Sequence, residues 1–436
     1  MTKVPVTESL EAYFQRKQEE LLFLTGFLAR PPGLPEPRSI EAVTEHKFRL
    51  AAALKAERAL ADWRRTETSW ADDGRPYHIG FYDLQSSYRR ADLTLDGPPI
   101  YGALADTGWR EISTTYAGSG MSSISTLLAA LGRVLPGARL VAPAGAYGET
   151  LEAVAHYGGS LRLDEPRPGD RPLGPAPRAE PCVVLVDSCV PARLVPPARD
   201  GRCDLVLFDT TCLSAGSARI RRVLSWAGSM ETPVALLRSH AKLDSLGIEY
   251  GRLGSTVLLA PAWTDRTRFA WLKRLDEEIK RAVRLFGVAP VPASLPPFAG
   301  HGRFALLNAK RIARIIANGR RIMRCLIRRG VPVTCYQHGL YGVLRAPDAW
   351  SLERAKRVAG VLANELRQAA LPVRHAGSFG FDFFAMDGFP DLALDRHGVR
   401  LAFSDVPGAV ADDVSDRIAR WWTAHVLTIH PRPQAA

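Results

Sequence analysis

The stretch Thr232-Pro233-Val234-Ala235-Leu236-Leu237-Arg238-Ser239-His240-Ala241-Lys242 passes from an apolar run into a polar loop that holds a lysine. Its β-branched and aliphatic residues predict a buried strand over Pro233–Arg238. A second apolar run, Asp204-Leu205-Val206-Leu207-Phe208-Asp209, predicts another strand that ends in a carboxylate. Similar runs predict strands at Arg139–Pro143, Cys182–Asp187 and Thr256–Ala260.

Helices are expected between these strands, for example over Ser122–Gly132 and Arg268–Phe286. Short apolar strands that alternate with helices are typical of a mostly parallel sheet covered on both faces. The sequence therefore predicts an α/β fold, with a large domain over residues 76–288.

The segments before and after the large domain do not show this alternation of strands and helices. Residues 1–75 predict a peripheral N-terminal helical arm, in which Ser39 caps a helix over Ile40–Trp63. The proline-rich segment Pro290–Pro297 marks a boundary, and a small C-terminal α+β domain is expected over residues 298–436. Its predicted elements are helices near 303–329, 351–369 and 408–424 and strand-like runs at Arg374–Met386 and Val399–Phe403.

Composition narrows the class of protein. The 436 residues are 46% hydrophobic and 23% charged, which is typical of a globular protein. No apolar run reaches the roughly 18 residues needed to cross a bilayer, so no membrane partner is expected. The first residues, Met1–Pro5, lack the apolar segment of a secretion signal, and we expect a cytoplasmic protein.

The six cysteines show no Cys-x-x-Cys spacing, so neither a metal site nor a disulfide framework is predicted. Four of them stand in or beside apolar runs and are expected to be buried, reduced thiols. These are Cys182, Cys189, Cys203 and Cys212.

The net charge of +12 is compatible with nucleic acid, with an acidic substrate or with no specific partner. Much of it lies in the predicted helix from Arg303 to Arg329, where basic and apolar residues recur at helical spacing. This pattern favours an amphipathic helix with a solvated basic face. Since no DNA- or RNA-binding motif accompanies it, no nucleic-acid partner is expected.

Lys242 and Asp209 together suit the chemistry of pyridoxal 5'-phosphate (PLP). A lysine holds the aldehyde of this cofactor covalently, and an aspartate keeps its ring nitrogen protonated so that the ring accepts electrons. The alternative for Lys242 taken alone is an ordinary solvated charge.

A second motif, Gly118-Ser119-Gly120-Met121-Ser122-Ser123-Ile124-Ser125, runs from small residues into an amphipathic segment. This pattern is typical of a loop that leads into a helix N-terminus. Backbone N–H groups and the helix dipole make such a place suitable for phosphate. The alternative is a Ser/Gly turn that caps an ordinary helix.

The order of motifs resembles the cystathionine γ-synthase/methionine γ-lyase family of fold-type-I PLP enzymes. That family carries Y-x-R, S-G-M, Y-G-G-T, an aspartate on a strand, S-x-T-K and a late R-L-S, in this order. The corresponding segments here are Tyr88-Arg89-Arg90, Ser119-Gly120-Met121, Tyr147-Gly148-Glu149-Thr150, Asp209-Thr210-Thr211, Ser239-His240-Ala241-Lys242 and Arg400-Leu401-Ala402-Phe403. The resemblance covers roughly residues 80–410 and implies the aspartate-aminotransferase-like fold of that group.

The resemblance also implies residue roles. Lys242 and Tyr147 would be catalytic, with the Tyr147 ring stacked on the cofactor ring. The other cofactor-binding residues would be Gly120, Met121, Asp209, Thr211 and Ser239, together with Tyr88 and Arg90, which reach the phosphate in the neighbouring subunit. Arg400 would hold the substrate α-carboxylate by its bidentate fork, and Ser378 would assist it or simply lie in a turn. A homodimer or homotetramer with shared active sites is implied.

Three departures from the family pattern affect these roles. Ala241 replaces the threonine before the lysine, so one phosphate contact is missing or comes from elsewhere, with His240 as a candidate. The segment Asp187-Ser188-Cys189-Val190-Pro191 offers no asparagine to the cofactor's 3-oxygen. Gly247–Arg252 replaces G-H-x-D and adds charges near the mouth of the site. These changes favour an unusual substrate.

The leading functional interpretation is γ-elimination or γ-replacement on an α-amino acid, through quinonoid and vinylglycine-type intermediates. The substrate would resemble an O-acyl- or O-phosphohomoserine or S-adenosylmethionine, with a γ-substituent that is bulky or anionic. As a transferase or lyase, the enzyme would form a new bond in specialised biosynthesis or release the γ-group. The alternatives are an aminotransferase or other α-carbon chemistry on the same fold, and a PLP-binding protein without turnover.

Overall fold

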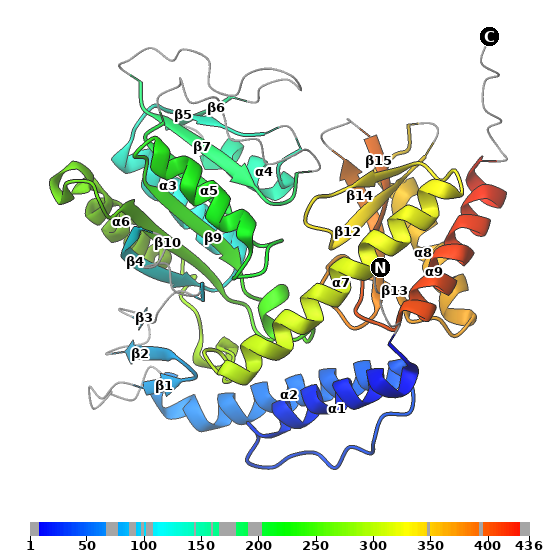
Figure 1. The fold of residues 1–436 in the computed structure, drawn as a ribbon. Helices are drawn as coiled ribbons and strands as arrows, with labels where there is room; N and C mark the ends of the chain where they lie inside the picture. The colour runs from blue at the N-terminus through cyan, green and yellow to red at the C-terminus, as the bar shows by residue number, and fades with distance from the viewer. Residues whose placement is uncertain are drawn as a thin grey trace, which may run out of the picture. The chain divides into compact units, whose positions relative to one another are not determined.

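The computed structural model describes residues 8–66, 77–86, 93–96, 100–101, 108–143, 145–157, 160–164, 180–190, 203–346, 349–391 and 396–427 (Figure 1). The chain divides into two compact units. The large unit comprises Leu54–Ser245 and Glu249–Ala305, and the composite unit comprises Met1–Ala53, Leu246–Ile248 and Leu306–Ala436. The three domains expected from the sequence remain a prediction, from which these units differ by grouping residues 1–53 with the C-terminal part.

A seven-stranded sheet forms the centre of the large unit. Its strands β9, β8, β7, β5 and β6 are parallel, whereas β10 is antiparallel to both of its neighbours, β9 and β4. The order across the sheet is β4 (Trp109–Ala117), β10 (Gly254–Pro261), β9 (Val234–Ser239), β8 (Leu205–Asp209), β7 (Cys182–Asp187), β5 (Ala138–Val141) and β6 (Leu161–Asp164). The predicted α/β fold with a mostly parallel sheet is confirmed.

Both faces of this sheet are covered, because successive strand residues point to opposite sides. Leu205 and Leu207 of β8 belong to a core formed with α3 (Gly120–Val134), α4 (Gly148–Tyr157) and α6 (Trp271–Leu285). Val206 and Phe208 belong to a second core, formed with α5 (Ala218–Ser229). The continuous apolar runs of the sequence are therefore explained by burial on both sides. Short 3₁₀ turns complete the unit at η2 (Leu243–Ser245), η3 (Arg266–Phe269) and η4 (Pro292–Ser294).

A three-stranded antiparallel sheet, absent from the sequence prediction, also belongs to the large unit. It consists of β1 (Tyr77–Ile79), β2 (Tyr82–Ser86) and β3 (Leu93–Asp96). The Tyr82 ring meets the Tyr116 ring of β4 edge-on, with 5.1 Å between centroids. This small sheet is thus anchored on the strand that precedes α3.

The composite unit is built on a five-stranded sheet in the order β11 (Val333–Cys335), β12 (Tyr341–Arg345), β15 (Arg396–Ala402), β14 (Phe384–Asp391) and β13 (Val373–His375). Helix α8 (Leu352–Gln368) packs against β13, β14 and β15. The other helical elements that contribute to it are α1 (Leu10–Thr25), the first part of α2 (Ile40–Thr66), most of α7 (Gly302–Arg328), α9 (Gly408–Trp422) and η5 (Thr423–Leu427). None of the described helices is long and apolar enough to cross a bilayer.

One strand prediction in this unit is wrong. The run Arg374–Met386 forms two strands, β13 and β14, which pair in parallel. Gly377-Ser378-Phe379-Gly380 interrupts the extended pattern, and Gly380 has a left-handed φ of 89° that side chains other than glycine rarely adopt. The chain therefore leaves the sheet after β13 and re-enters it as β14, parallel to β13.

The N-terminal helix α1 has a buried face that contains charged side chains. This helix and the first part of α2 run alongside each other (Figure 1) and join a buried charge network. Lys17 Nζ lies 2.6 Å from Asp382 Oδ1 and 2.7 Å from Asp405 Oδ2, and Lys47 Nζ lies 2.7 Å from Asp382 Oδ2. The charge network consists of Arg16, Lys17, Glu20, Lys47, Arg311, Asp382 and Asp405.

Candidate functional site

The candidate site lies at the carboxyl edge of the large unit's sheet. Because β7, β8 and β9 are parallel, their last residues, Asp187, Asp209 and Ser239, emerge at the same edge. Asp187 and Asp209 are direct Cα partners in the ladder. Lys242 follows in the loop between β9 and η2. Ligands of open α/β sheets bind at this edge.

The two aspartates form a buried acidic pair. Asp187 accepts hydrogen bonds from the backbone N–H groups of Tyr147 and Cys189, both at 2.7 Å, and Asp209 accepts one from Thr211 N–H at 2.7 Å. Burial, reinforced by the charge of Asp187, raises the pKa of Asp209 to about 7. Burial also raises the pKa of Asp187. A cationic ligand at this place would relieve the cost of ionising both carboxylates.

The start of α3 lies close to the end of β9. Ser119 caps this helix by accepting a hydrogen bond from Ser122 N–H at 3.0 Å. A Cβ added to Gly120 would lie 2.7 Å from Ser239 Cβ, so the glycine lets the end of β9 approach the helix N-terminus. Thr211 Oγ1 accepts a hydrogen bond from Ser239 N–H at 3.0 Å. The structure thus brings together Gly120, Ser239 and Thr211, next to the first N–H groups of α3, which have no partner within the helix. Met121 is half-buried on the same first turn.

Lys242 is accessible in this region. Its side chain is 29% exposed, and Nζ lies 3.4 Å from Glu249 Oε1. Glu249 has a φ of 43°, which is unusual for a residue other than glycine. Tyr147 is half-buried just before α4, where its N–H bond to Asp187 fixes its backbone beside the acidic pair.

His240, the candidate for the missing phosphate contact, has other partners. Its Nδ1 lies 3.0 Å from Asp244 Oδ2 and its Nε2 lies 2.8 Å from Ser255 Oγ, so both ring nitrogens already have protein partners. The ring is also buried at 2% exposure. This side chain therefore cannot serve the phosphate in place of the threonine that Ala241 replaces.

The residues expected to bind the substrate lie in the composite unit. Arg400 is buried on β15, with its guanidinium carbon 5.7 Å from the centroid of the Tyr341 ring and 5.3 Å from that of Phe389. Its Nε has no hydrogen-bond partner among the described residues. Ser378 is half-buried in the turn between β13 and β14. Tyr88 and Arg90 lie outside the described residues.

No protein-family model matches the chain, and neither does any curated protein sequence. Solved structures do match it. Cystathionine gamma synthase from Xanthomonas oryzae pv. oryzae is 16% identical over 82% of this chain and 92% of that chain, with a TM-score of 0.51. The protein metB of Corynebacterium glutamicum is 16% identical over 78% and 88%, with a TM-score of 0.50. Serine palmitoyltransferase of Sphingomonas wittichii is 13% identical over 74% and 75%, with a TM-score of 0.52.

The chain has the fold of the fold-type-I PLP enzymes. At these identities the likeness concerns the fold, and the predicted fold class is confirmed. The fold-type-I sheet accounts for the gathering of Lys242, Asp209 and the start of α3 at one edge, since that edge is where parallel strands end.

Sequence reasoning missed two features of this edge. Asp187 ends a predicted strand but is not predicted as a site residue, although its place at the end of an apolar run is the same as that of Asp209. This shared position was the available signal. Arg238 and Asp244, which flank Lys242, were not singled out because an arginine at a strand end ordinarily reads as a surface charge.

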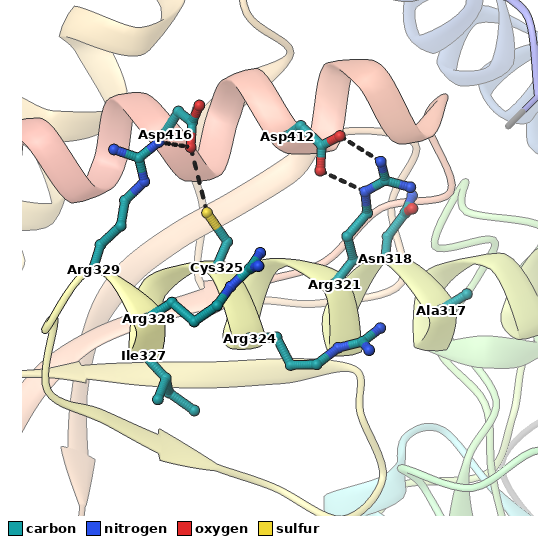
Figure 2. A pocket seen from close by; sticks show the side chains of 10 residues that line it. All are labelled: Ala317, Asn318, Arg321, Arg324, Cys325, Ile327, Arg328, Arg329, Asp412 and Asp416. Carbon is teal, nitrogen blue, oxygen red and sulfur yellow. Dashed lines mark hydrogen bonds and ion pairs between the residues drawn. The ribbon is translucent and has the colours of Figure 1, made fainter. Parts of the chain in front are cut away.

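The basic helix α7 borders a groove with α9. Figure 2 shows Arg321 directed at Asp412, and Arg329 directed at Asp416 with 2.7 Å between Nη2 and Oδ1. No drawn interaction involves Arg324 or Arg328. Arg321 and Arg329 therefore attach α9, whereas Arg311 belongs to the buried charge network. The exposed Arg324 and Arg328 fit the expected solvated basic face.

Proposed function

We propose that this chain is a PLP-dependent enzyme of amino-acid metabolism. The observation that carries the proposal is the buried Asp209, whose pKa is raised to about 7. It lies at the same sheet edge as Lys242 and the start of α3. A protonated ring nitrogen beside Asp209 would stabilise the ionised carboxylate, which burial and Asp187 otherwise disfavour.

The residues of the large unit fit this cofactor in three places. Gly120 and Met121 would bind the phosphate through backbone N–H groups and Ser239 through its hydroxyl, because the absence of a side chain at Gly120 lets Ser239 approach the helix N-terminus. Asp209, supported by Thr211, would pair with the ring nitrogen. Lys242 would bind the aldehyde and Tyr147 would cover the ring. When bound, PLP supplies a carbonyl for an amine and a ring that withdraws electrons from the attached carbon.

In the proposed reaction, a substrate amine would replace Lys242 at the cofactor aldehyde and so free the lysine amine. The free Lys242 amine would then remove the α-proton and a β-proton, and the γ-substituent would leave with its bonding electron pair. Tyr147 would assist proton transfer to the leaving group. The reaction would be γ-elimination or γ-replacement, and the γ-substituent is bulky or anionic.

Arg400 is the proposed partner of the substrate α-carboxylate, with Ser378 in a supporting role. Its buried Nε has no partner among the described residues, and two aromatic rings border its guanidinium group. A guanidinium group in such surroundings binds a carboxylate through two parallel hydrogen bonds.

The second candidate function is an aminotransferase or another reaction at the α-carbon. The match to a serine palmitoyltransferase, at a TM-score of 0.52, supports keeping it, since one fold hosts many reactions.

The two candidates differ in which protons exchange. The PLP-loaded protein would be incubated in deuterium oxide with O-acetylhomoserine, O-phosphohomoserine or S-adenosylmethionine, with Lys242→Ala as control. γ-Chemistry predicts release of the γ-group and deuterium at both Cα and Cβ of the product, read by mass spectrometry and NMR. Deuterium at Cα alone, without release of a γ-group, would favour the α-carbon reaction instead.

A further inference from the structure

A buried ion pair closes the loop that contains Lys242. Arg238 Nε lies 2.6 Å from Asp244 Oδ2, and Arg238 Nη2 lies 2.7 Å from Asp244 Oδ1. Arg238 is 1% exposed and Asp244 3% exposed. This bidentate pair joins the two ends of the segment Ser239–Leu243, so the loop cannot open without breaking it.

His240 fastens the same loop to β10. It lies between Asp244 and Ser255 of β10, and its backbone N–H donates to Leu253 O at 2.9 Å. Burial lowers the pKa of His240 more than Asp244 raises it. Because the Asp244 carboxylate can only accept, Nδ1–H of His240 donates to it. The lowered pKa favours the neutral ring, in which Nε2 accepts from the Ser255 hydroxyl.

Arg238 also connects this loop to the one that follows Asp209. Its Nη1 donates to Thr210 O at 3.0 Å and to Leu213 O at 2.8 Å. Thr210 N–H in turn donates to Leu237 O of β9 at 2.9 Å. One buried guanidinium group thus fixes the chain on both sides of the candidate cofactor site.

The bonds from Asp244 through His240 to Ser255 have the order of a hydrolase triad. However, Ser255 is 1% exposed and His240 2% exposed, so no substrate carbonyl reaches the hydroxyl. Arg238 additionally neutralises Asp244. These side chains therefore act on the loop and not on a substrate.

We propose that Arg238, His240 and Asp244 are positioning residues that hold Lys242 and Ser239 at fixed places relative to Asp209. The inference rests on the proposed function, since it assumes that the cofactor bonds to Lys242. It explains why a loop with Ala241 in place of a phosphate-binding threonine still presents its lysine in a defined place. The three residues would set how readily Lys242 reaches the cofactor aldehyde.

The test uses the rate at which cofactor-free protein captures PLP on Lys242, measured by borohydride reduction at successive times and peptide mapping. The main variant is Arg238→Met/Asp244→Leu, because an apolar pair of similar volume commonly replaces a buried ion pair without loss of stability. Its capture rate should fall by about tenfold or more, since small misplacements of a reacting group have effects of this size. Arg238→Lys, which keeps the charge but loses the fork, should also slow capture.

Leu259→Ala is the matched control. Leu259 is a buried core residue of the same strand as Ser255, but it pairs with Val234 at the start of β9, away from Arg238. It should lower the melting temperature but leave the capture rate of the folded protein unchanged. Capture at the wild-type rate by folded Arg238→Lys or by the folded double variant would overturn the positioning role alone. If wild-type protein captures no PLP on Lys242, both this inference and the proposed function are wrong.

Discussion

Asp209 is a buried carboxylate that stands next to a second buried carboxylate. It is 7% exposed, and another buried carboxylate, Asp187, stands opposite it in the sheet. Two buried carboxylates that face each other in this way are costly to ionise, and a positively charged ligand would reduce that cost.

A pH dependence of stability follows from this arrangement. The folded pKa of Asp209, about 7, is above its ordinary value of 3.8. The folded state therefore holds a proton that the unfolded state has lost, and the contribution of Asp209 to stability falls as pH rises from about 4 to about 7. In cofactor-free protein, Asp209→Asn should increase the free energy of unfolding by about 2–4 kcal/mol at pH 8, an advantage that vanishes near pH 4.

Urea denaturation of the cofactor-free protein at pH 4, 6 and 8 measures this effect. Asp164→Asn is a suitable control because Asp164 ends β6 at the same edge but is 43% exposed. A variant Asp209→Asn that is less stable than wild type at every pH would show that the carboxylate is stabilised by the fold.

At this scale the sequence predicted Lys242 and Asp209 as members of a site, because each follows an apolar run that could only be a buried strand. It did not predict the Arg238–Asp244 pair. Arginine is almost never fully buried unless it is paired, and its partner here becomes recognisable only when the loop is closed in three dimensions. The orientation of the His240 ring also depends on how this loop closes, so the sequence did not predict that the ring is buried between Asp244 and Ser255.

At the scale of elements, the start of α3 depends on the absence of a side chain at Gly120. A methyl group there would meet Ser239 at 2.7 Å, so β9 or the helix would have to move. Gly120→Ala should weaken PLP binding by about tenfold or more, because the backbone N–H groups would no longer converge on the phosphate. Absorbance titration of cofactor-free protein measures the dissociation constant.

The matched control is Gly216→Ala, since a Cβ at Gly216 would meet no atom within 4 Å. This variant should bind PLP as wild type does. Equal affinities for the two variants would exclude a phosphate site at the start of α3.

Helix α1 contributes Lys17 to the buried charge network, and loss of this charge is expected to lower the free energy of unfolding. Lys17 is fully buried and contacts Glu20, Asp382 and Asp405. Lys17→Met leaves these carboxylates with fewer cations and should lower the free energy of unfolding by about 3–5 kcal/mol. Arg268→Met, which removes an exposed ion pair with Glu231, should lower it by less than about 1 kcal/mol. Comparable losses in urea denaturation would contradict the buried network.

Most long elements were predicted from the sequence because burial on one or two faces gives apolar residues the regular spacing of a helix or a strand. The helix expected at 408–424, for example, is α9 at Gly408–Trp422. The strands β1 to β3 were missed because they are short and their pattern is not apolar. The split of Arg374–Met386 was missed because the pairing of β13 with β14 is a tertiary feature.

At the scale of the whole molecule, the proposal implies more than one chain. In the family that this sequence resembles, the segment that corresponds to Tyr88 and Arg90 binds the cofactor of the neighbouring subunit. We therefore expect at least a homodimer with shared sites. Mixing inactive Lys242→Ala with inactive Arg90→Ala chains should restore part of the activity, because one site of each hybrid dimer has both residues.

Native mass spectrometry of the mixture shows whether hybrids have formed. Hybrid dimers that remain inactive would mean that Arg90 serves its own chain or has no role. The test needs no assumption about the substrate beyond one that the wild-type protein converts.

The central claim is that Lys242 carries PLP, and its most direct test is the mass of the lysine peptides after reduction. Purified protein loaded with PLP would be reduced with borohydride, digested and mapped, with Lys242→Ala in parallel. We expect a pyridoxyl-phosphate adduct on the peptide that contains Lys242 and no adduct in the variant. An adduct on another lysine, or an unmodified Lys242 peptide in protein that has been saturated with PLP, would contradict it.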